Sequence, residues 1–309
     1  MKKVFIDGSQ GTTGLRIYDR LSRRNDIQLI SLPDELRKDT AARAEIINSS
    51  DITFLCLPDA AAIEAAGMAN DNVIIFDTST AHRTDAQWIY GFPEVFNDGA
   101  ERLEKANRIA VPGCHASGFI ALTKPLVDAG ILDKDALITC HSITGYSGGG
   151  KKMIAEYEDS DRDILLDAPR QYGLTQNHKH LKEMKAVSGL SNTPIFCPIV
   201  SDFYSGMCVT VPLFKEQLKK GADINTVRQL FKERYTGPVV RYFEDACESG
   251  FASANKISGS DAMQIFVEGN EDRILLIARY DNLGKGASGA AIQCMNIVLK
   301  SDMTLGLEL

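Results

Sequence analysis

Short apolar runs alternate with longer amphipathic or alanine-rich stretches over the first part of the chain. A short apolar run bounded by turn residues predicts a buried strand, and apolar positions at helical spacing predict a helix. Strands are expected at residues 4–6, 27–31, 51–57, 73–76 and 108–111, and helices at residues 15–23 and 60–66. Strands that alternate with helices are typical of a parallel sheet covered by helices, so this part is predicted to be a doubly wound α/β domain.

The pattern changes after about residue 117, where the apolar runs become longer and the helices fewer. Strands are expected at residues 136–144, 195–200, 206–214, 264–267 and 273–279, and helices at residues 119–129, 181–185 and 223–235. Long strands with few helices between them predict an α+β domain with a mixed or antiparallel sheet. The segment at residues 281–289, with the small residues Gly286, Ala287 and Gly289, precedes a last helix at 290–299, which we expect to return to the first domain.

A glycine-rich loop joins the first predicted strand to the first predicted helix. Its glycines follow a G-x-x-G-x-x-G spacing, a variant of the dinucleotide-binding fingerprint. Such glycines permit a tight turn and let a pyrophosphate approach the backbone N–H groups at the start of the helix. We predict that this loop binds a dinucleotide; glycines that only shape the turn are the alternative. The loop residues are Gly8, Ser9, Gln10, Gly11, Thr12, Thr13 and Gly14.

The end of the second predicted strand bears on which dinucleotide is bound. Folds that bind NAD usually place an acidic residue there, where it accepts hydrogen bonds from the ribose 2′-OH. This chain has Ser31, followed by Arg37 and Lys38. A hydroxyl followed by cations suits a 2′-phosphate, so we predict NADP(H), with Ser31 and Arg37 as cofactor ligands. The acidic residues Asp34 and Glu35 lie between them, and a solvated charged loop is the alternative.

We therefore expect a Rossmann-type NADP-binding domain at residues 1–116 and 285–309, and a second domain for substrate binding, catalysis and oligomerisation at residues 117–284. The apolar strands of the second domain suit contact between two sheets, so we expect a homo-oligomer, a dimer or a tetramer. The sequence does not distinguish these two states.

Composition excludes several classes of partner. The chain has 309 residues, 44% of them hydrophobic, and a net charge of −7, which argues against nucleic acid or an anionic membrane as the main partner. No apolar run reaches the length of about 18 residues that a membrane span needs. The chain begins directly with a predicted strand, so we expect no signal peptide. Seven scattered cysteines without a Cys-x-x-Cys pair indicate neither a disulfide framework nor a zinc site. We expect a cytoplasmic protein without a metal.

Cys114 differs from the other six cysteines by its position. It follows Pro112-Gly113 at the mouth of a predicted helix, whereas most of the others lie in apolar company typical of a core. The N-terminus of a helix favours negative charge, so the Cys114 thiol should deprotonate more easily and act as a nucleophile. His178 and His180 are the candidates for an acid or base, because the pKa of imidazole lies near neutrality.

Two further segments offer candidate anion ligands. Ser79 and Arg83 follow the strand at 73–76, at the sheet edge where open α/β folds bind ligands. Lys151 ends a glycine-rich segment at residues 145–151, which we interpret as a flexible loop on the substrate side. A segment that only shapes the turn and a plain mobile linker are the respective alternatives.

Several of these segments, taken together, carry a resemblance to a family. The chain resembles the N-acetyl-gamma-glutamyl-phosphate reductases of the shorter type over essentially its whole length. The specific elements are Tyr-Gly-Phe-Pro-Glu at residues 90–94 and Asp-Asn-Leu-Gly-Lys-Gly-Ala-Ser-Gly at residues 281–289. The glycine loop, Pro-Gly-Cys at 112–114 and His-Lys-His at 178–180 come in the same order. The glycine loop and Pro-Gly-Cys are also similar to aspartate-semialdehyde dehydrogenases.

The resemblance implies reduction of N-acetyl-L-glutamyl 5-phosphate by NADPH to the 5-semialdehyde and phosphate, in arginine biosynthesis. Cys114 would form a thioester, and His180 or His178 would act as the acid/base. Longer members tend to have a proline after the second histidine, where this chain has Leu181, so the choice between the two histidines stays open. Arg83 and Lys151 would bind the substrate phosphate.

Two other functions stay open at this point. One is an aspartate-semialdehyde dehydrogenase-like enzyme with a different acyl phosphate. The other belongs to a different class: an NADP-binding redox sensor in which Cys114 is the oxidised residue and Cys140, the nearest cysteine in sequence, is its resolving partner.

Overall fold

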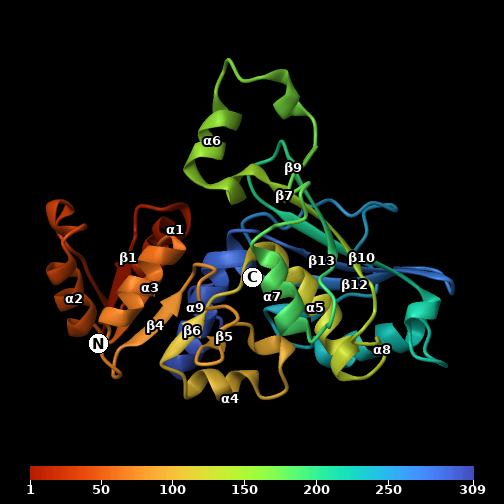
Figure 1. The fold of residues 1–309 in the computed structure, drawn as a ribbon, viewed down its shortest axis with the longest axis horizontal. Helices are drawn as coiled ribbons and strands as arrows, with labels where there is room; N and C mark the ends of the chain where they lie inside the picture. The colour runs from red at the N-terminus through yellow and green to blue at the C-terminus, as the bar shows by residue number, and fades with distance from the viewer. The chain divides into compact units, whose positions relative to one another are not determined.

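The computed structural model describes residues 1–309, which form two compact units (Figure 1). The first unit comprises residues 1–93, 98–112 and 287–307, and the second comprises residues 94–97, 113–286 and 308–309. The boundaries of these units lie at 112/113 and 286/287, a few residues from the sequence-based boundaries at 116/117 and 284/285. Cys114 therefore lies in the second unit.

The first unit contains a six-stranded parallel sheet in the order β2-β1-β3-β4-β6-β5. Side chains from alternate positions of β1 enter two different cores. Val4 and Ile6 pack in a cluster with α1 and α9, and Phe5 packs in a cluster with α2 and α3. Helices thus pack against both faces, as a doubly wound sheet requires. The elements are β1 (Lys2–Asp7), α1 (Thr12–Leu21), β2 (Ile27–Ile30), α2 (Thr40–Ser49), β3 (Ile52–Leu55), α3 (Asp59–Met68), β4 (Ile74–Asp77), β5 (Ile89–Tyr90), α4 (Gly99–Glu104), β6 (Arg108–Ala110) and α9 (Gly289–Val298).

Helix α9 was expected in this unit from the sequence, and helix α2 was not. The C-terminal helix α9 packs in the core of the first unit beside β1, which confirms that the chain returns there. Helix α2 was not expected from the pattern. It buries only Arg43 and Ile47, so it lacks a long apolar stripe that periodicity could reveal.

The second unit contains a seven-stranded mixed sheet in the order β11-β12-β13-β10-β7-β9-β8. β7 pairs with β9 in parallel, while β10 is antiparallel to both β7 and β13. Helix α5 packs on β10 and β13, and α7 packs on α5. The elements are α5 (Cys114–Asp128), β7 (Thr139–Gly145), α6 (Gly150–Glu158), β8 (Arg170–Gln171), α7 (His180–Ser188), β9 (Ile195–Ser201), β10 (Met207–Phe214), α8 (Ile224–Arg234), β11 (Val240–Tyr242), β12 (Met263–Gly269) and β13 (Arg273–Tyr280).

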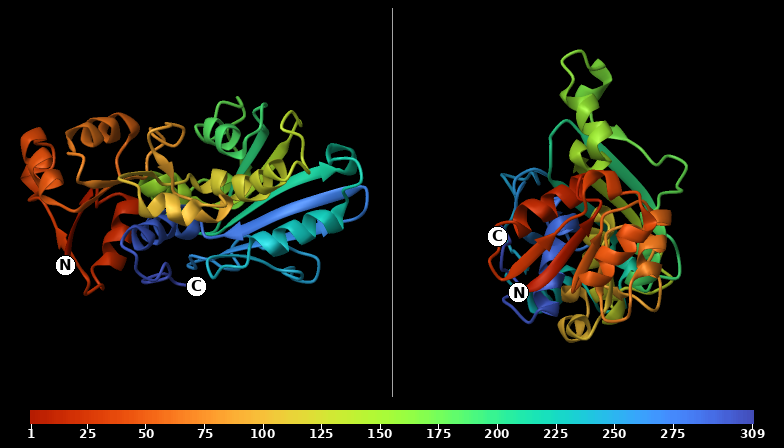
Figure 2. Two further views of the ribbon diagram at one scale, coloured as in Figure 1. Left: turned by 90° about the horizontal axis from the view of Figure 1, so that it is seen from below. Right: turned by 90° about the vertical axis from the view of Figure 1, so that its left-hand side faces the viewer.

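The segment after β7 corrects one prediction. Residues 145–151 are not a flexible loop: a 3-10 turn at Tyr146–Gly149 leads directly into α6. Figure 1 and the right-hand view of Figure 2 show α6 in a segment that projects from the sheet of this unit. Stacking of Tyr146 on Tyr157 at 4.7 Å between ring centroids holds the base of this segment. The glycines here serve a tight helical turn. No helix of the chain is long and apolar enough to cross a membrane.

Candidate active site

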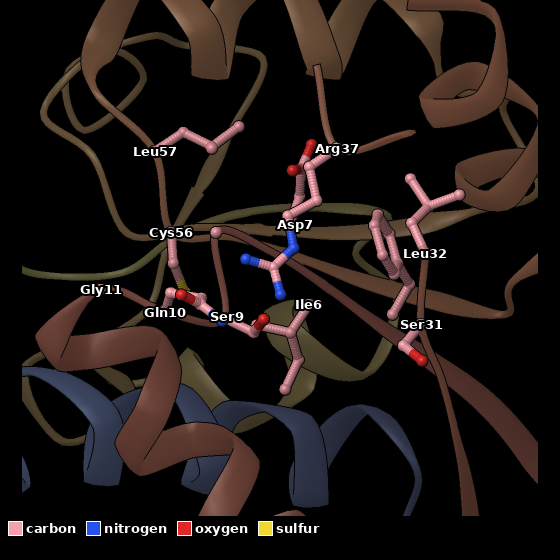
Figure 3. A pocket seen from close by; sticks show the side chains of 12 residues that line it. Ile6, Asp7, Ser9, Gln10, Gly11, Ser31, Leu32, Arg37, Cys56 and Leu57 are labelled. Carbon is pink, nitrogen blue, oxygen red and sulfur yellow. The ribbon is translucent and has the colours of Figure 1, made fainter. Parts of the chain in front are cut away.

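A cavity of about 320 Å³ in the first unit brings together the glycine loop, the end of β2 and Arg37 (Figure 3). Ser9, Gln10 and Gly11 form one side of it, and Ser31 lies on the other. Thr12, Thr13 and Gly14 are not on its wall, because they begin helix α1. The full wall consists of Phe5, Ile6, Asp7, Gly8, Ser9, Gln10, Gly11, Ser31, Leu32, Arg37, Cys56 and Leu57.

The three glycines of the loop have different roles. Gly8 has φ +87°, and a Cβ there would lie 2.3 Å from the carbonyl oxygen of Cys56, so the turn requires glycine. A Cβ on Gly14 would lie 2.3 Å from the carbonyl oxygen of Gly8, so glycine is also required where α1 starts. At Gly11 the nearest atom would be at 3.5 Å, which is ordinary contact. Gly11 instead lines the cavity, where the absence of a side chain would let a ligand approach the backbone.

Arg37 provides the positive charge in this cavity, and its guanidinium extends between the glycine loop and Ser31 (Figure 3). With its amide assigned so that the oxygen faces Arg37, Gln10 accepts hydrogen bonds from both Nη atoms, at 2.9 and 3.0 Å. Arg37 also forms an ion pair with Asp34. No acidic side chain lies on the cavity wall at the end of β2, where Ser31 and Leu32 stand. This arrangement suits a ribose 2′-phosphate.

An acidic side chain on the cavity wall, Asp7 at the end of β1, is already paired. Its Oδ2 accepts hydrogen bonds from Nη2 and Nε of Arg43 at 2.9 and 3.1 Å. Both side chains are buried, and burial raises the pKa of Asp7 while Arg43 opposes that shift. This pair could not be predicted from the sequence, because Arg43 lies on helix α2, which carries no clear helical pattern.

Ser79 and Arg83, the predicted anion ligands after β4, are buried in the first unit and bonded locally. The Ser79 hydroxyl donates to Asp77 at 2.8 Å. Arg83 donates from Nε to the carbonyl of Val111 and from Nη2 to the carbonyl of Thr78, both at 2.9 Å. These bonds hold the turn after β4 against the end of β6, which is the turn-shaping role that the sequence left open. An anion-binding role for either residue remains a prediction.

Cys114 is the first residue of α5 in the second unit, with Gly113 as the N-cap. The backbone N–H of Gly113 donates to Oε1 of Glu183 on α7, at 2.8 Å. Gly286 lies against the other side of Cys114, since a Cβ on Gly286 would be 3.0 Å from the Cβ of the cysteine. The thiol therefore stands at a helix N-terminus, as predicted, and close packing surrounds its backbone. A role for Glu183 was not predicted from the sequence, although Glu183 lies three residues after His180, at helical spacing.

His178 and His180 stand together at the start of α7, with ring centroids 4.8 Å apart. Nδ1 of His178 accepts the backbone N–H of His180 at 3.2 Å, which leaves Nε2 to carry the proton of the neutral ring. Burial and the nearby Lys179 lower the pKa of His178 to about 4. His178 thus accepts the backbone N–H of the first residue of α7 as a neutral imidazole, whereas the ring of His180 is buried.

His115, the residue after Cys114, joins these histidines. Its Nδ1 is 2.6 Å from the hydroxyl of Ser142, and its Nε2 is 2.6 Å from the hydroxyl of Tyr172. Its ring centroid lies 5.8 and 5.6 Å from those of His178 and His180. Burial lowers the pKa of His115 to about 3. We call Cys114, His115, His178 and His180 the thiol–histidine cluster; it is held by two packed helices, α5 and α7.

The loop after β13 closes around the carboxylate of Asp281. This carboxylate accepts hydrogen bonds from Ser205 Oγ at 2.7 Å and from the backbone N–H of Gly259 at 2.6 Å. Lys285 is 1% exposed, and its Nζ lies 2.9 and 3.0 Å from the two carboxylate oxygens of Glu94. Glu94 and Lys285 belong to the two most specific segments found in the sequence. A buried ion pair therefore joins segments that are far apart in the chain.

The remaining candidate from the sequence is Lys151, and His82 is a further histidine outside the thiol–histidine cluster. Lys151 is exposed on the first turn of α6. His82 stacks on Trp88 at 4.0 Å and bonds to Asp77, which is a structural role. The structure places no group of three or more His, Cys, Asp or Glu side chains where they could hold a metal ion.

Two family models match the chain. The model described as semialdehyde dehydrogenase, NAD binding domain matches residues 32–103, which lie in the first unit except for residues 94–97. The model described as semialdehyde dehydrogenase, dimerisation domain matches residues 114–282, which include the thiol–histidine cluster. The two matches therefore separate a nucleotide-binding part from a second part, as the two sheets do.

Similar proteins are found over the whole length of the chain. The N-acetyl-gamma-glutamyl-phosphate reductase of Rhizobium meliloti is 43% identical over 307 residues, covering 97% of this chain and 99% of that protein. N-acetyl-gamma-glutamyl-phosphate reductase 2 of a Nostoc species is 43% identical over 318 residues, covering 99% of both.

Solved structures of lower identity share the fold. Aspartate semialdehyde dehydrogenase from Francisella tularensis superposes with a TM-score of 0.70 at 14% identity, covering 97% of this chain and 100% of that one. Aspartate semialdehyde dehydrogenase II from Vibrio cholerae gives 0.69 at 18% identity, covering 97% and 98%. At these identities the likeness concerns the fold alone.

Proposed function

Because the chain belongs to the N-acetyl-gamma-glutamyl-phosphate reductase family, we propose that it reduces N-acetyl-L-glutamyl 5-phosphate with NADPH to N-acetyl-L-glutamate 5-semialdehyde and phosphate. The protein is an oxidoreductase that acts on an acyl phosphate, in arginine biosynthesis. The observation that carries the proposal is the thiol–histidine cluster: Cys114 stands at a helix N-terminus, and the ring of the next residue, His115, lies 5.8 and 5.6 Å from the rings of His178 and His180.

The cavity of the first unit suits NADPH. Gly11 and the start of α1 would hold the pyrophosphate, and Ser31 with Arg37 would hold the 2′-phosphate. When bound, NADPH supplies the hydride that reduces the enzyme-bound acyl group. The aldehyde product therefore carries one hydrogen on its carbonyl carbon that the acyl phosphate lacked.

Cys114 performs the first chemical step. Its thiolate attacks the acyl carbon, and N–H groups at the start of α5 stabilise the tetrahedral oxyanion. The oxyanion collapses, the C–O bond to phosphate breaks, and a thioester on Cys114 remains. Arg83 and Lys151 are the proposed ligands of the leaving phosphate. After reduction, the C–S bond of the thiohemiacetal breaks and releases the aldehyde.

His180 is the proposed acid/base, with His178 as its partner. Three observations favour His180 over His178 as the acid/base. The Nδ1 atom of His178 is occupied by the backbone of His180, and the pKa of His178 is lowered to about 4, so at neutral pH His178 is a poor proton donor. His180 lies one turn from Glu183, which holds the residue before Cys114. His180 would protonate the oxygen of the thiohemiacetal as it forms and accept that proton back as the C–S bond breaks.

The reverse reaction tests this function. N-acetyl-glutamate 5-semialdehyde and phosphate are supplied with NADP⁺, and NADPH formation is followed beside a reaction with aspartate semialdehyde. Activity with the acetylated aldehyde alone, and only with phosphate present, is the expected result. A preference for aspartate semialdehyde would instead indicate an aspartate-semialdehyde dehydrogenase activity. No activity with either, despite NADPH binding, would overturn the enzymatic function.

A redox sensor finds no support from the cysteines. Cys140, the nearest candidate for a resolving cysteine, is fully buried in β7, and burial raises its pKa further above the usual thiol value. A buried, protonated thiol exchanges slowly. All seven cysteines are free.

We also propose a homo-oligomer in the cytoplasm. The face of the second sheet that α5 does not cover exposes the apolar side chains of Ile143, Ile195, Phe214 and Leu275. An apolar sheet face of this kind suits a second copy of the chain. Ile143→Glu, examined by light scattering after size exclusion, should release monomers, whereas Leu174→Glu, an exposed leucine outside the strands of the sheet, should not. Equal masses for both variants would exclude this face.

A further inference from the structure

The hydroxyl of Tyr280 lies in the first turn of the helix that carries the nucleophile. Tyr280 is the last residue of β13, and its side chain is fully buried under α5. Its hydroxyl donates to the carbonyl oxygen of Cys114 at 2.5 Å and accepts the backbone N–H of Gly118 at 3.0 Å. These two backbone groups are i and i+4 partners of an ordinary α-helix. The tyrosine therefore bridges the backbone turn that begins at the nucleophile.

Gly118 makes this approach possible. A Cβ on Gly118 would lie 2.7 Å from the hydroxyl oxygen of Tyr280 and 2.6 Å from Cγ2 of Val209 on β10. Any side chain at position 118 would thus push α5 away from the sheet or expel the hydroxyl. Glycine, which has no side chain, therefore stands where the hydroxyl of Tyr280 reaches the backbone of α5. The approach of β13 to α5 depends on the residue at position 118.

We propose that Tyr280 is the positioning residue of Cys114: by holding the carbonyl of the nucleophile, it fixes the first turn of α5 and thereby the direction of the thiolate and of the N–H groups around it. The inference rests on the proposed function, because Cys114 is the nucleophile there. The tyrosine does not exchange protons with the substrate, since its single proton is donated to the carbonyl of Cys114.

The protonation state of the phenol agrees with this role. Burial raises the pKa of Tyr280 well above 10, and the nearby Cys114 adds to that shift. The hydroxyl therefore stays protonated at every pH at which the enzyme would work. Its hydrogen bond to Cys114 persists while the thiol gains and loses its own proton.

The chain offers a matched control: a second buried tyrosine whose hydroxyl bonds to the backbone of α5. Tyr235 is also buried, and its hydroxyl donates to the carbonyl oxygen of Ala121 at 2.6 Å. Ala121 lies about two turns beyond Cys114 on α5. Tyr235→Phe and Tyr280→Phe each remove one buried hydroxyl that bonds to the backbone of α5 and keep the ring that fills the core. Only Tyr280→Phe removes it beside the nucleophile.

The experiment compares the two phenylalanine variants with the natural chain in three measurements. Thermal unfolding should show a loss of a few °C in both. Alkylation of Cys114 by iodoacetamide, followed by mass spectrometry of its peptide across pH, should shift upward by about one pH unit only in Tyr280→Phe, which is about a tenfold lower rate at pH 7. Turnover should fall about tenfold or more in the same variant, with the KM for NADPH unchanged.

Equal alkylation profiles and equal kcat in the two variants would overturn the proposal and leave Tyr280 as a core residue. Alkylation needs neither NADPH nor acyl phosphate, so its result stands if the proposed reaction is not observed. Both kinetic measurements are made below the lower of the two unfolding midpoints, so that a loss of folded protein does not contribute. Gly118→Ala should reproduce the alkylation shift; a natural profile in a folded Gly118→Ala variant would also contradict the proposal.

Discussion

The cavity of the first unit and the thiol–histidine cluster are built in different ways. Every residue that lines the cavity lies between positions 5 and 57, within consecutive strand–helix units. The cluster and its supports come from positions between 113 and 286, on α5, α7, β7 and the loop after β13. A site made from one short segment can be recognised from its spacing. A site made from distant segments depends on sheet register and helix packing.

The two regions also differ in charge. The cavity contains a cation, Arg37, in reach of solvent and suited to a phosphate. The cluster contains imidazoles that burial keeps neutral, with the pKa of His115 lowered to about 3 and that of His178 to about 4. Changes in the cavity should therefore act on cofactor affinity, and changes in the cluster should act on chemistry and on acid stability.

The largest effect is expected from Cys114→Ser. A serine hydroxyl in place of the thiolate is a far weaker nucleophile, so turnover should fall by about 10³-fold or more. NADPH affinity, measured by fluorescence titration, should stay within about twofold because the cavity is elsewhere in the chain. Cys197→Ser, which removes another partly exposed cysteine, is the control and should keep its activity. Comparable losses in both variants would contradict the assignment of the nucleophile.

Glu183→Ala should have the next largest effect. The backbone N–H of Gly113 would lose its buried acceptor, at a cost of about 1–3 kcal/mol. A small displacement of the nucleophile can reduce the rate by about 100-fold. Glu183→Gln keeps an oxygen that accepts this hydrogen bond and should recover most of the activity. If kcat is equally low in the alanine and glutamine variants, the carboxylate charge matters rather than the hydrogen bond.

Arg37→Ala should separate the cavity from the cluster. A charged hydrogen bond to a phosphate contributes about 1.5–3 kcal/mol, so the KM for NADPH should rise about tenfold or more while kcat stays the same. The preference for NADPH over NADH should fall in proportion. Lys38→Ala removes a neighbouring exposed charge that does not line the cavity, and it should change the KM by less than about twofold. An equal rise in both variants would indicate general attraction of the anion.

The smallest effect concerns acid stability of the second unit. His115 and His178 have pKa values lowered to about 3 and about 4, below the value of about 6.5 in an unfolded chain. The unfolded state therefore binds more protons between pH 4 and 6.5, and stability falls as pH falls through that range. The slope is at most about 1.4 kcal/mol per pH unit for each histidine.

His115→Gln should reduce this loss, because one buried group that resists protonation is removed. Unfolding in urea at pH 5 and pH 7 gives the free energy of unfolding of the natural chain and of the His115→Gln variant at each pH. Hydrogen exchange of α5 and α7 compared with α1 and α3 shows in which unit the change occurs. An unchanged difference between the two pH values in His115→Gln would show that other groups cause the acid sensitivity.

Much of the fold could be predicted because most elements carry their own signal. Most strands of both sheets are apolar runs bounded by turn residues, and β9, β10 and β13 lie within a residue or two of their expected positions. The short strands β5, β8 and β11 were not predicted, and β8 consists of Arg170 and Gln171. Helix α2 could not be predicted from a pattern of apolar residues, because one of its two buried residues is an arginine. Arg43 is buried because it pairs with Asp7 at the end of β1. The segment at 145–151 was misjudged as a loop, because glycines permit a tight helical turn as readily as a flexible one.

Local order in the amino-acid sequence by itself determined the alternation of strand and helix, the glycine loop with Gly8, Gly11 and Gly14, and a cysteine at a helix start. Each depends on residues that are neighbours in the chain. Only the tertiary structure decided that Tyr280 reaches the carbonyl of Cys114 and that Glu183 holds Gly113. Those contacts depend on the pairing of β13 with β10 and the packing of α7 on α5, which no spacing in the sequence expresses.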